Sequence, residues 1–306
     1  MAGNNAIKEV LGNFTNKVFY DEPMSSHTSL CVGGRADALV MIEDEDQLTQ
    51  IVGGLSGGKI NYLPVGNLTN IIVRDGGYRG VILLMKGLKE IRYEQMPDGG
   101  HYIRAEAGAA LSKLVGFALT NELTGLEFCA GIPGSVGGAL WMNAGAYGKE
   151  MKDVVFSISL LTAEGKNINM KRQDIAFSYR RVTLPTEAII LSGEFKLEKG
   201  VSGQIKKKIG EIMRLRQDKH PLEYPNAGSI FKNLPGMPAG RIIEELGIKG
   251  KRCGDAEVSL QHANFIVNKG RATAADILTL ISLIQDTVKK EKGINLETEV
   301  VIIGEN

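Results

Sequence analysis

The sequence predicts an α+β fold in which β-structure predominates over about the first two thirds of the chain. There, short runs rich in β-branched and aromatic residues alternate with glycine turns. From Ser202 the pattern changes to charge-rich helical periodicity, which continues to Arg216. The 306 residues, 43% of them hydrophobic, suffice for about two domains, each with its own core. We therefore expect domains at 1–200 and 201–306.

The expected elements follow in chain order. Strands of the first part are expected at 38–42, 61–65, 70–73, 80–85, 89–93, 102–107, 154–162, 168–171 and 188–197. Its helices are expected at 45–53, after an acidic run, and at 111–122, and residues 163–166 suit a hairpin turn. In the second part we expect helices at 202–216, 240–246 and 274–290, and strands at 263–267 and 299–303. Glu297 and Glu299, two residues apart at the last strand, would share one face.

Composition excludes several classes of function. Lys and Arg number 36 against 35 Asp and Glu, so bulk charge indicates neither a nucleic-acid nor an anionic-membrane partner. No apolar run reaches the roughly 18 residues of a membrane helix, and the first residues lack a signal-peptide layout, so we expect a cytoplasmic protein. Three distant cysteines and four unclustered histidines indicate reduced thiols and no metal site.

The most informative stretch is residues 127–148, EFCAGIPGSVGGALWMNAGAYG. Its glycines leave backbone amides bare of side chains and readily take left-handed conformations, so that successive amides can converge on one anion. Residues 135–142 read as a short helix whose first amides would point into the preceding glycine loop, which suits a pyrophosphate. The alternative is a tight glycine turn. The chain's only tryptophan, Trp141, favours a wall that a ligand can touch.

Two other segments offer donors of the same kind. Residues 63–77 form a strand, a Gly/Asn/Thr loop and a second strand, and could hold the same diphosphate from another side. Residues 27–37 are a third donor-rich approach to a strand. Each segment taken alone is also compatible with a plain turn.

In this order, the segments resemble the UDP-N-acetylenolpyruvoylglucosamine reductases, flavoenzymes of early peptidoglycan synthesis. The resemblance runs from about Thr28 to Gly304. Its specific motifs are GIPGSVGG at 131–138, MNAGAYG at 142–148, FSYR at 177–180, NAGSIFKN at 226–233 and LETEV at 296–300. The chain is similar to the shorter subtype, in which Arg180 leads to the second domain without a long inserted loop.

The resemblance implies a vanillyl-alcohol-oxidase-type FAD-binding domain of two subdomains, followed by a smaller α+β substrate-binding domain. FAD would be bound non-covalently, and NADPH would supply the hydride. The partner would be a small-molecule substrate, a UDP-sugar, and the protein would be a monomer. The implied reaction transfers hydride through the flavin to the enolpyruvyl ether of UDP-N-acetylglucosamine enolpyruvate. The carboxylate-stabilised enolate is then protonated to give UDP-N-acetylmuramate for cell-wall synthesis.

The resemblance also implies the site residues. The cofactor would contact Gly66, Asn67, Thr69, Asn70, Gly131, Pro133, Gly134, Ser135, Gly137, Gly138, Asn143, Ala144 and Gly145. Substrate would contact Lys219, Lys232 and Asn233. No metal is implied.

Three further residues are implied to be catalytic. Ser229 would donate the proton, which a weak acid can do when it faces a strongly basic carbon. Arg180, rather than its neighbour Arg181, would hold the substrate carboxylate with a bidentate fork. Glu299 would polarise that carboxylate if protonated, and Glu297 is the competing candidate.

The chain departs from the family pattern at three positions. Leu260 stands where an acidic residue is usual, Leu68 where a glycine is typical and Thr69 where a serine is. The last two suggest a slightly reshaped flavin loop. Two alternatives remain: a flavin oxidase or dehydrogenase acting on another alcohol or sugar, and a non-catalytic nucleotide-binding regulator. Neither needs the catalytic residues of the second domain.

Overall fold

Two compact units make up the chain in a computed structural model that describes residues 2–95 and 99–306. Unit 1 comprises residues up to Tyr20, Ala38–Asn67 and Gly80–Leu215; unit 2 comprises Asp21–Asp37, Leu68–Arg79 and Arg216–Asn306. The units therefore alternate along the chain, and the division falls inside a helix rather than at Gly200. The expected domains 1–200 and 201–306 stay a prediction about independent folding.

Unit 1 contains two hydrophobic cores. Its helices are α1 (Ala2–Leu11), α2 (Glu45–Gly57), α3 (Leu111–Thr120) and α4 (Val136–Trp141). Its strands are β3 (Tyr62–Val65), β6 (Ile91–Gln95), β7 (His101–Glu106), β8 (Leu123–Thr124), β9 (Gly145–Ala146), β10 (Lys149–Glu150), β11 (Val155–Leu161), β12 (Asn167–Lys171), β13 (Ala176–Ser178), β14 (Arg181–Thr183) and β15 (Ile189–Lys199). Four elements belong partly to each unit: β1 (Val18–Pro23), β2 (Arg35–Met41), β5 (Tyr78–Leu84) and α5 (Ser202–Lys219).

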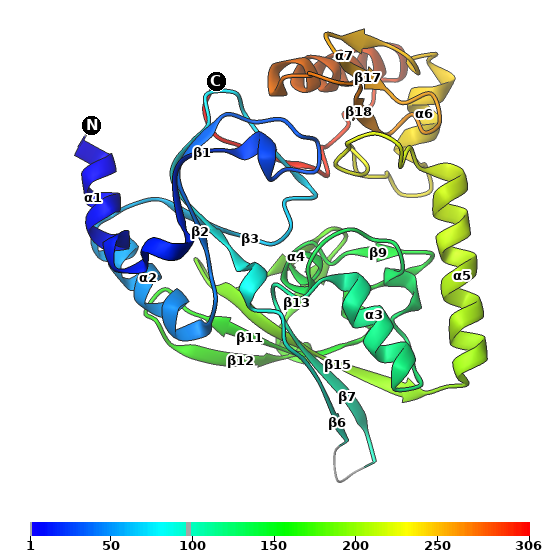
Figure 1. Ribbon diagram of the computed structural model, residues 1–306. Coiled ribbons are helices and arrows are strands. Elements are labelled where there is room, and N and C mark those ends of the chain that lie inside the picture. The colour runs from blue at the N-terminus through cyan, green and yellow to red at the C-terminus, as the bar shows by residue number, and fades with distance from the viewer. Residues whose placement is uncertain (1, 96–98) are drawn as a thin grey trace. The chain divides into compact units, whose positions relative to one another are not determined.

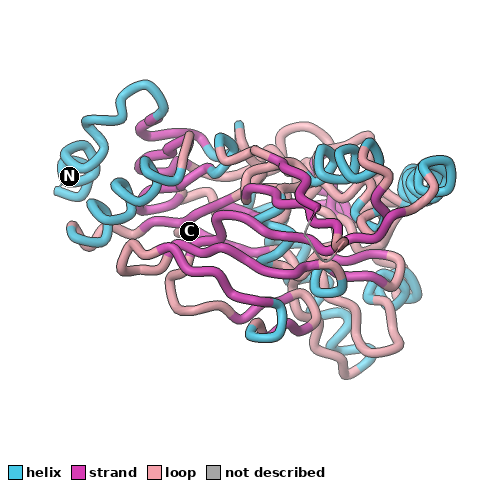
Figure 2. Tube along the Cα trace, turned by 90° about the horizontal axis from the view of Figure 1, so that it is seen from below, coloured by secondary structure: helices cyan, strands magenta, loops and turns pink. Residues whose placement is uncertain are grey.

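The larger sheet of unit 1 has the order β12-β11-β15-β7-β6, with β8 also paired to β15. Its helices α3 and α4 bury Leu114, Val136 and Leu140 in one core with residues of β7, β11 and β15. The second core joins α1 and α2, which lie side by side near the N-terminus in both views (Figures 1 and 2). The expected division of the FAD-binding domain into two subdomains stays a prediction.

Local sequence explains where these helices begin. The side chain of Asp44 accepts the N–H of Gln47 and so starts α2, and Ser135 starts α4 by accepting the N–H of Gly138. Residues 163–166 connect the antiparallel strands β11 and β12, so the predicted hairpin is confirmed.

Unit 2 packs the helices α6 and α7 and short strands around its own core. Its complete elements are β4 (Ile71–Val73), α6 (Ala239–Glu245), β16 (Arg252–Cys253), β17 (Ala256–Val258), β18 (Ile266–Asn268), α7 (Ala274–Lys292) and β19 (Val301–Ile303). The sheet β16-β17-β18 lies beside α7, and β19 pairs parallel with β4 (Figure 1). The helix α7 begins with a capping box of Thr273 and Asp276 and ends at Gly293, which has a φ of 69°.

The last predicted strand is wrong in its extent. It begins at Val301, so Glu297 and Glu299 precede it and do not share a strand face. The reason is that the backbone of residues 297–299 is hydrogen-bonded to residues 230–232 instead. The predicted strand at 263–267 is also displaced, to Ile266–Asn268. The helices expected at 45–53, 111–122, 202–216, 240–246 and 274–290 are confirmed.

Candidate active site

The start of α4 does not offer the amides that its sequence indicates. The N–H of Val136 donates to Ala109 O at 2.9 Å and that of Gly137 to Ala107 O at 2.8 Å. The N–H of Gly138 donates to the side chain of Ser135 at 3.3 Å. The interpretation of these helical amides as pyrophosphate donors is therefore wrong, because the residues before α3 already satisfy two of them and the cap satisfies the third.

The glycine loop ahead of α4 has the conformation that glycines permit. Gly131 has a φ of 72° and Gly134 a φ of 144°, with Pro133 between them. At 144°, Gly134 occupies a region that L-residues rarely adopt. The expected cofactor contacts of this loop thus stay a prediction that rests on its own amides and not on the helix.

A second loop approaches the same place within unit 1. A Cβ atom on Gly66, directly after β3, would lie 2.1 Å from Ser135 Oγ. A Cβ on Gly137 would lie 2.8 Å from that of Ala107. Only glycines allow these approaches, so the two predicted phosphate-binding segments do converge. Backbone and the Ser135 hydroxyl meet at this approach, and such groups suit a diphosphate of a flavin nucleotide.

The loop continues from Gly66 and Asn67 in unit 1 to Thr69 and Asn70 in unit 2. Leu68, where a glycine is typical, has a φ of 54° and is buried. The leucine therefore keeps a left-handed conformation while its side chain packs. Thr69 O accepts the hydroxyl of Ser29 at 3.3 Å.

Asn143 is a structural centre of the loop after α4. Its side chain is fully buried; Nδ2 donates to Glu150 Oε2 and to Ser178 O, and Oδ1 accepts the N–H of Lys152. An expected cofactor contact of Asn143 must therefore come from its backbone. The adjoining Ala144 and Gly145 lead into β9, while Trp141 is 52% exposed.

Arg180 occupies the turn between β13 and β14. Their pairing leaves Tyr179 and Arg180 as the two connecting residues, and Arg180 has a φ of 56°. Its guanidinium lies 5.1 Å from the centre of the Tyr179 ring. Arg181, the rejected candidate, is exposed at the start of β14. The turn is held from behind by the bond from Asn143 to Ser178 O at 3.0 Å.

In unit 2, backbone hydrogen bonds join the segment that follows Ser229 to the segment that contains Glu299. The N–H of Glu299 donates to Ile230 O at 2.7 Å, and that of Lys232 donates to Glu297 O at 2.9 Å. Asn70 joins the same arrangement, because its Nδ2 donates to Glu299 O at 3.1 Å. The structure thus brings together two of the three predicted catalytic residues, whereas Arg180 belongs to unit 1.

The two candidate glutamates differ in their surroundings. The Glu297 side chain is 76% exposed and pairs with Lys232 at 3.0 Å. Glu299 is half-buried. This difference favours Glu299 as the candidate, because Glu297 is already engaged in an exposed ion pair.

The predicted substrate residues are dispersed over unit 2. Lys219 is exposed at the end of α5, and Lys232 is engaged with Glu297. Asn233 Oδ1 accepts the N–H of Ala239 at 3.0 Å and so supports the start of α6. Their expected contacts with substrate stay predictions.

An aromatic cluster that the sequence did not reveal lies beside Lys219. His220 and His262 both contact Phe265, with ring centres 5.0 and 4.8 Å away. Burial, and then the charges of Arg216, His262 and Lys219, lower the pKa of His220 to about 4. Burial also lowers the pKa of His262. Both rings are therefore neutral at pH 7.

Leu260, which replaces the usual acidic residue, is 68% exposed on the same loop. Its neighbour Gln261 donates through Nε2 to Gln217 O and Asp218 O, at 3.3 and 3.0 Å. These bonds satisfy carbonyl groups at the end of α5. The loop is thus anchored without the missing carboxylate.

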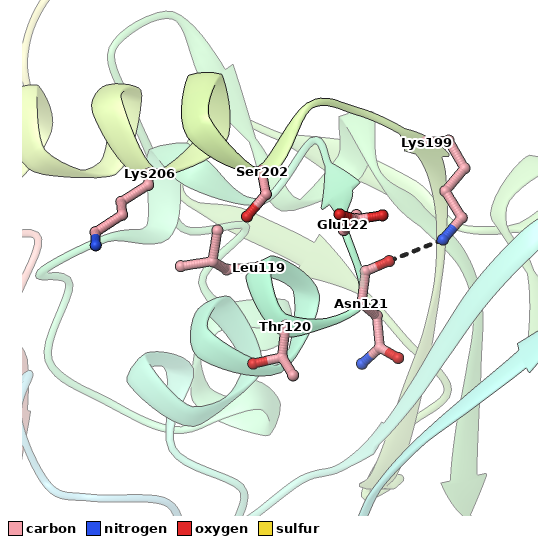
Figure 3. A pocket seen from close by; sticks show the side chains of 7 residues that line it. All are labelled: Leu119, Thr120, Asn121, Glu122, Lys199, Ser202 and Lys206. Atoms are coloured by element: carbon pink, nitrogen blue, oxygen red, sulfur yellow. Dashed lines mark hydrogen bonds between the residues drawn. The ribbon is translucent and has the colours of Figure 1, made fainter.

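A hollow of about 550 Å³ lies elsewhere in unit 1, between the end of α3 and the start of α5 (Figure 3). In it, Lys199 Nζ donates to Asn121 O at 3.0 Å, which neutralises the carbonyl end of α3 (Figure 3). None of the predicted site residues lines this hollow.

Among the residues that the structure describes, no helix combines the length and apolarity needed to cross a bilayer.

Comparisons with known proteins agree across the chain. Residues 220–303 match the C-terminal domain of UDP-N-acetylenolpyruvoylglucosamine reductase, and residues 36–171 match an FAD binding domain. The reductase of Syntrophus aciditrophicus is 48% identical over 98% of this chain and 96% of its own. That of Caldanaerobacter subterraneus is 44% identical over 98% of this chain and 97% of its own.

A solved structure supports the same relationship. The crystal structure of UDP-N-acetylenolpyruvylglucosamine reductase from Thermus caldophilus has a TM-score of 0.78 and is 32% identical, covering 94% of this chain and 98% of that one. The expected α+β fold, with an FAD-binding domain followed by a C-terminal domain of this reductase family, is confirmed.

Proposed function

The chain belongs to the UDP-N-acetylenolpyruvoylglucosamine reductase family, and we propose that it uses NADPH to reduce UDP-N-acetylglucosamine enolpyruvate to UDP-N-acetylmuramate. It is an FAD-binding oxidoreductase. The specific proposal is supported by one observation: residues 230–232 are hydrogen-bonded to residues 297–299 through their backbones. Ser229 and Glu299 therefore belong to neighbouring segments of the chain. A cytoplasmic location and a monomeric state stay predictions from the sequence.

The residues that would hold FAD are Gly66 and Asn67 after β3 and the loop Gly131–Gly134 ahead of α4, through their own backbone amides. Contacts of Thr69 and Asn70 with the cofactor stay predictions from the sequence. When bound there, FAD would supply the hydride transfer from NADPH to the vinyl carbon of the substrate. The close approach of Gly66 to Ser135 supports this assignment, because it leaves backbone and hydroxyl donors without a bulky side chain.

The protein's own residues then act on the charge that develops next to the substrate carboxylate. Arg180 would hold that carboxylate and stabilise the enolate, since a guanidinium matches two oxygens at once. Its turn between β13 and β14 limits the freedom of its backbone. Glu299, if protonated, would donate a hydrogen bond to the same group.

Ser229 would donate the proton that completes the product. Its hydroxyl is a weak acid, but an enolate carbon is a strong base, so position matters more than acidity. The buried neighbours Ala227 and Ile230 fix the backbone on both sides of Ser229. The oxidase and regulatory alternatives give no role to this second-unit arrangement, which is why we favour the reductase.

The test is an anaerobic absorption experiment on the FAD-loaded protein. NADPH should bleach the flavin, and UDP-N-acetylglucosamine enolpyruvate should restore its colour. A flavin that is reduced but not reoxidised by this sugar would favour an oxidase acting on another substrate. A chain unable to take up FAD would refute the assignment of the two loops.

Ser229→Ala provides the first mutational prediction. Flavin reduction by NADPH should stay within about twofold of the wild-type rate, while reoxidation by the sugar should slow by about 10²- to 10⁴-fold. Stopped-flow absorbance measures the two half-reactions separately, so the first serves as the control for the second. Normal reoxidation would remove Ser229 from the proposed chemistry.

A further inference from the structure

The side chain of Asn264 replaces a neighbouring strand along one edge of Phe231. Its Oδ1 accepts the N–H of Phe231 at 3.0 Å, and its Nδ2 donates to the carbonyl of the same residue at 2.8 Å. The main-chain carbonyl of Asn264 also accepts the N–H of Ile230, at 2.8 Å. Asn264 is only 3% exposed, so water cannot replace a lost partner.

The opposite edge of the same short segment carries the second catalytic candidate. Ile230 O accepts the N–H of Glu299 at 2.7 Å. Ile230 is thus bound on one side by Asn264 and on the other by Glu299, and Ser229 directly precedes it in the chain. Ile230 and Phe231 are fully buried, so they cannot shift without disturbing the core of unit 2.

The loop that presents Asn264 is itself braced. Ser259 Oγ accepts the N–H groups of Gln261 and His262, at 3.1 and 3.3 Å. The N–H of Asn264 donates to His262 Nδ1 at 3.2 Å. The N–H of Ser259 donates to Phe265 O at 2.9 Å, which closes the loop. Asn264 therefore has a defined position before any ligand binds.

We infer that Asn264 is a positioning residue, which fixes Ser229 relative to Glu299 by clamping the backbone of Ile230 and Phe231 between them. This inference rests on the proposed roles of Ser229 and Glu299. A displacement of about 1 Å at a reacting group can cost on the order of 10²-fold in rate. Asn264 needs no contact with substrate to have that effect.

Asn264→Asp tests the clamp through the bond to Phe231 O. The carboxylate would place a negative oxygen where Nδ2 now donates, so it would repel that carbonyl. Protonation of the carboxyl restores a donor, and burial favours protonation. The titratable groups on the surrounding segments are Lys219, His220, Lys232, Glu244, Lys249, His262, Glu297 and Glu299. Their own titration is common to the wild type, which is measured beside the variant.

At pH 8, the variant should be reoxidised by the enolpyruvyl sugar about 10- to 100-fold more slowly than the wild type, with NADPH reduction within about twofold. Lowering the pH should restore reoxidation toward the wild-type rate. Amide hydrogen exchange in peptides covering residues 229–232 should be faster than in the wild type at pH 8. This readout is independent of flavin turnover.

The matched control is Asn268→Asp. Asn268 is equally buried, and its Nδ2 donates to Leu30 O at 3.0 Å while its Oδ1 accepts the N–H groups of Gly270 and Ala272. The control should lose stability without a selective, pH-reversible loss of reoxidation. If Asn264→Asp does not fold at pH 8, Asn264→Ser should still show the selective loss, because it removes both bonds to Phe231 without adding charge.

Two results would overturn the inference: wild-type reoxidation by Asn264→Asp at pH 8, or an equal effect of Asn268→Asp. Failure of the proposed function looks different, because the wild type itself would then not be reoxidised by the sugar. In that case the exchange measurement would still show whether Asn264 clamps the segment, but its catalytic role would fall.

Discussion

At the scale of single residues, neighbouring side chains of one type have different tasks. Glu297 and Glu299 stand two positions apart, yet one is exposed in an ion pair with Lys232 and the other is half-buried against Ile230 and Asn70. Sequence spacing suggests that they are interchangeable. The surroundings of each carboxyl group, and not the spacing in sequence, distinguish the two candidates.

Glu299→Gln should slow reoxidation of the flavin by the sugar by about 10²-fold or more, because an amide is a weaker hydrogen-bond donor than a protonated carboxyl and cannot release a proton. Glu297→Gln should be mild, since it removes only an exposed ion pair worth at most about 1 kcal/mol. Stopped-flow reoxidation rates compare the two variants directly. The reverse order of effects would transfer the assignment to Glu297.

At the scale of elements, the junction between β3 and α4 depends on one absent side chain. Gly66→Ala would push Ser135 Oγ from its place and weaken the cap of α4, because the new Cβ has no room. We expect the variant to be purified with less FAD and to bind it at least about 10-fold more weakly, a change of about 1.4 kcal/mol.

The ratio of flavin to protein absorbance and an FAD titration measure that change. Gly116→Ala is the matched control, because a Cβ at this position of α3 meets no atom within 4 Å. It should bind FAD normally. Unchanged FAD affinity of Gly66→Ala would show that the two loops do not hold the cofactor together.

The start of α7 depends on a residue far away in sequence. Asp75 Oδ1 accepts the N–H of Ala274 at 2.9 Å, and Oδ2 accepts that of Ala275 at 2.8 Å. Two of the four unsatisfied amides of the helix are thus bound by a carboxylate, which also favours the positive end of its dipole.

Asp75→Ala should lower the free energy of unfolding by about 0.5–2 kcal/mol, the usual range for a lost cap. Urea denaturation followed by circular dichroism measures the loss. Asp286→Ala, which removes an exposed carboxylate within α7, should change stability by no more than about 0.5 kcal/mol. Equal effects of the two substitutions would deny the cap.

At the scale of the whole molecule, the sequence predicted more of the elements than of their partners. Regular helices can be predicted from the spacing of apolar residues, as with Ile205, Ile209 and Ile212 in α5. The pairing of residues 230–232 with 297–299 could not be predicted, because no local sequence pattern marks a backbone hydrogen bond between distant segments. Asn264 was missed for the same reason: its function depends on a buried carbonyl group at Phe231, which the sequence does not display.

The α4 amides show a second limit. The motif at 131–138 correctly predicts a loop and a short helix, but it cannot show that Val136 and Gly137 have already given their N–H groups to residues 107 and 109. Resemblance supplied the roles of Ser229, Arg180 and Glu299, and those roles remain predictions. Leu68 also has a left-handed backbone conformation, with a φ of 54°, which is uncommon for a leucine.

Stability of the whole protein should fall in mild acid because of His220. Its pKa is about 4 in the folded chain, against about 6.5 for an unperturbed histidine, owing first to burial and then to Arg216, His262 and Lys219. Above pH 6.5 the ring is neutral in both states and has no effect. Between pH 6.5 and 4 only the unfolded chain takes up the proton, so unfolding becomes easier.

His220→Phe keeps a ring against Phe265 and removes the titration. Its urea midpoint should therefore fall less between pH 7.5 and pH 5 than that of the wild type. A histidine NMR titration should meanwhile lose the resonance that titrates near pH 4. An identical pH dependence in both proteins would exclude His220 as the cause.

The alternation of the two units along the chain has a consequence for biosynthesis. β4 pairs in parallel with β19, and the register joins Ile71 to Val301. During synthesis, Ile71–Val73 and Asp75 therefore leave the ribosome before their partners in unit 2 exist, and most of unit 1 is translated in between. Unit 1 can begin to fold around its own cores during that time. Unit 2 can complete this pairing only after translation has passed Ile303, so a chain stalled earlier would hold Ile71–Val73 without its parallel partner.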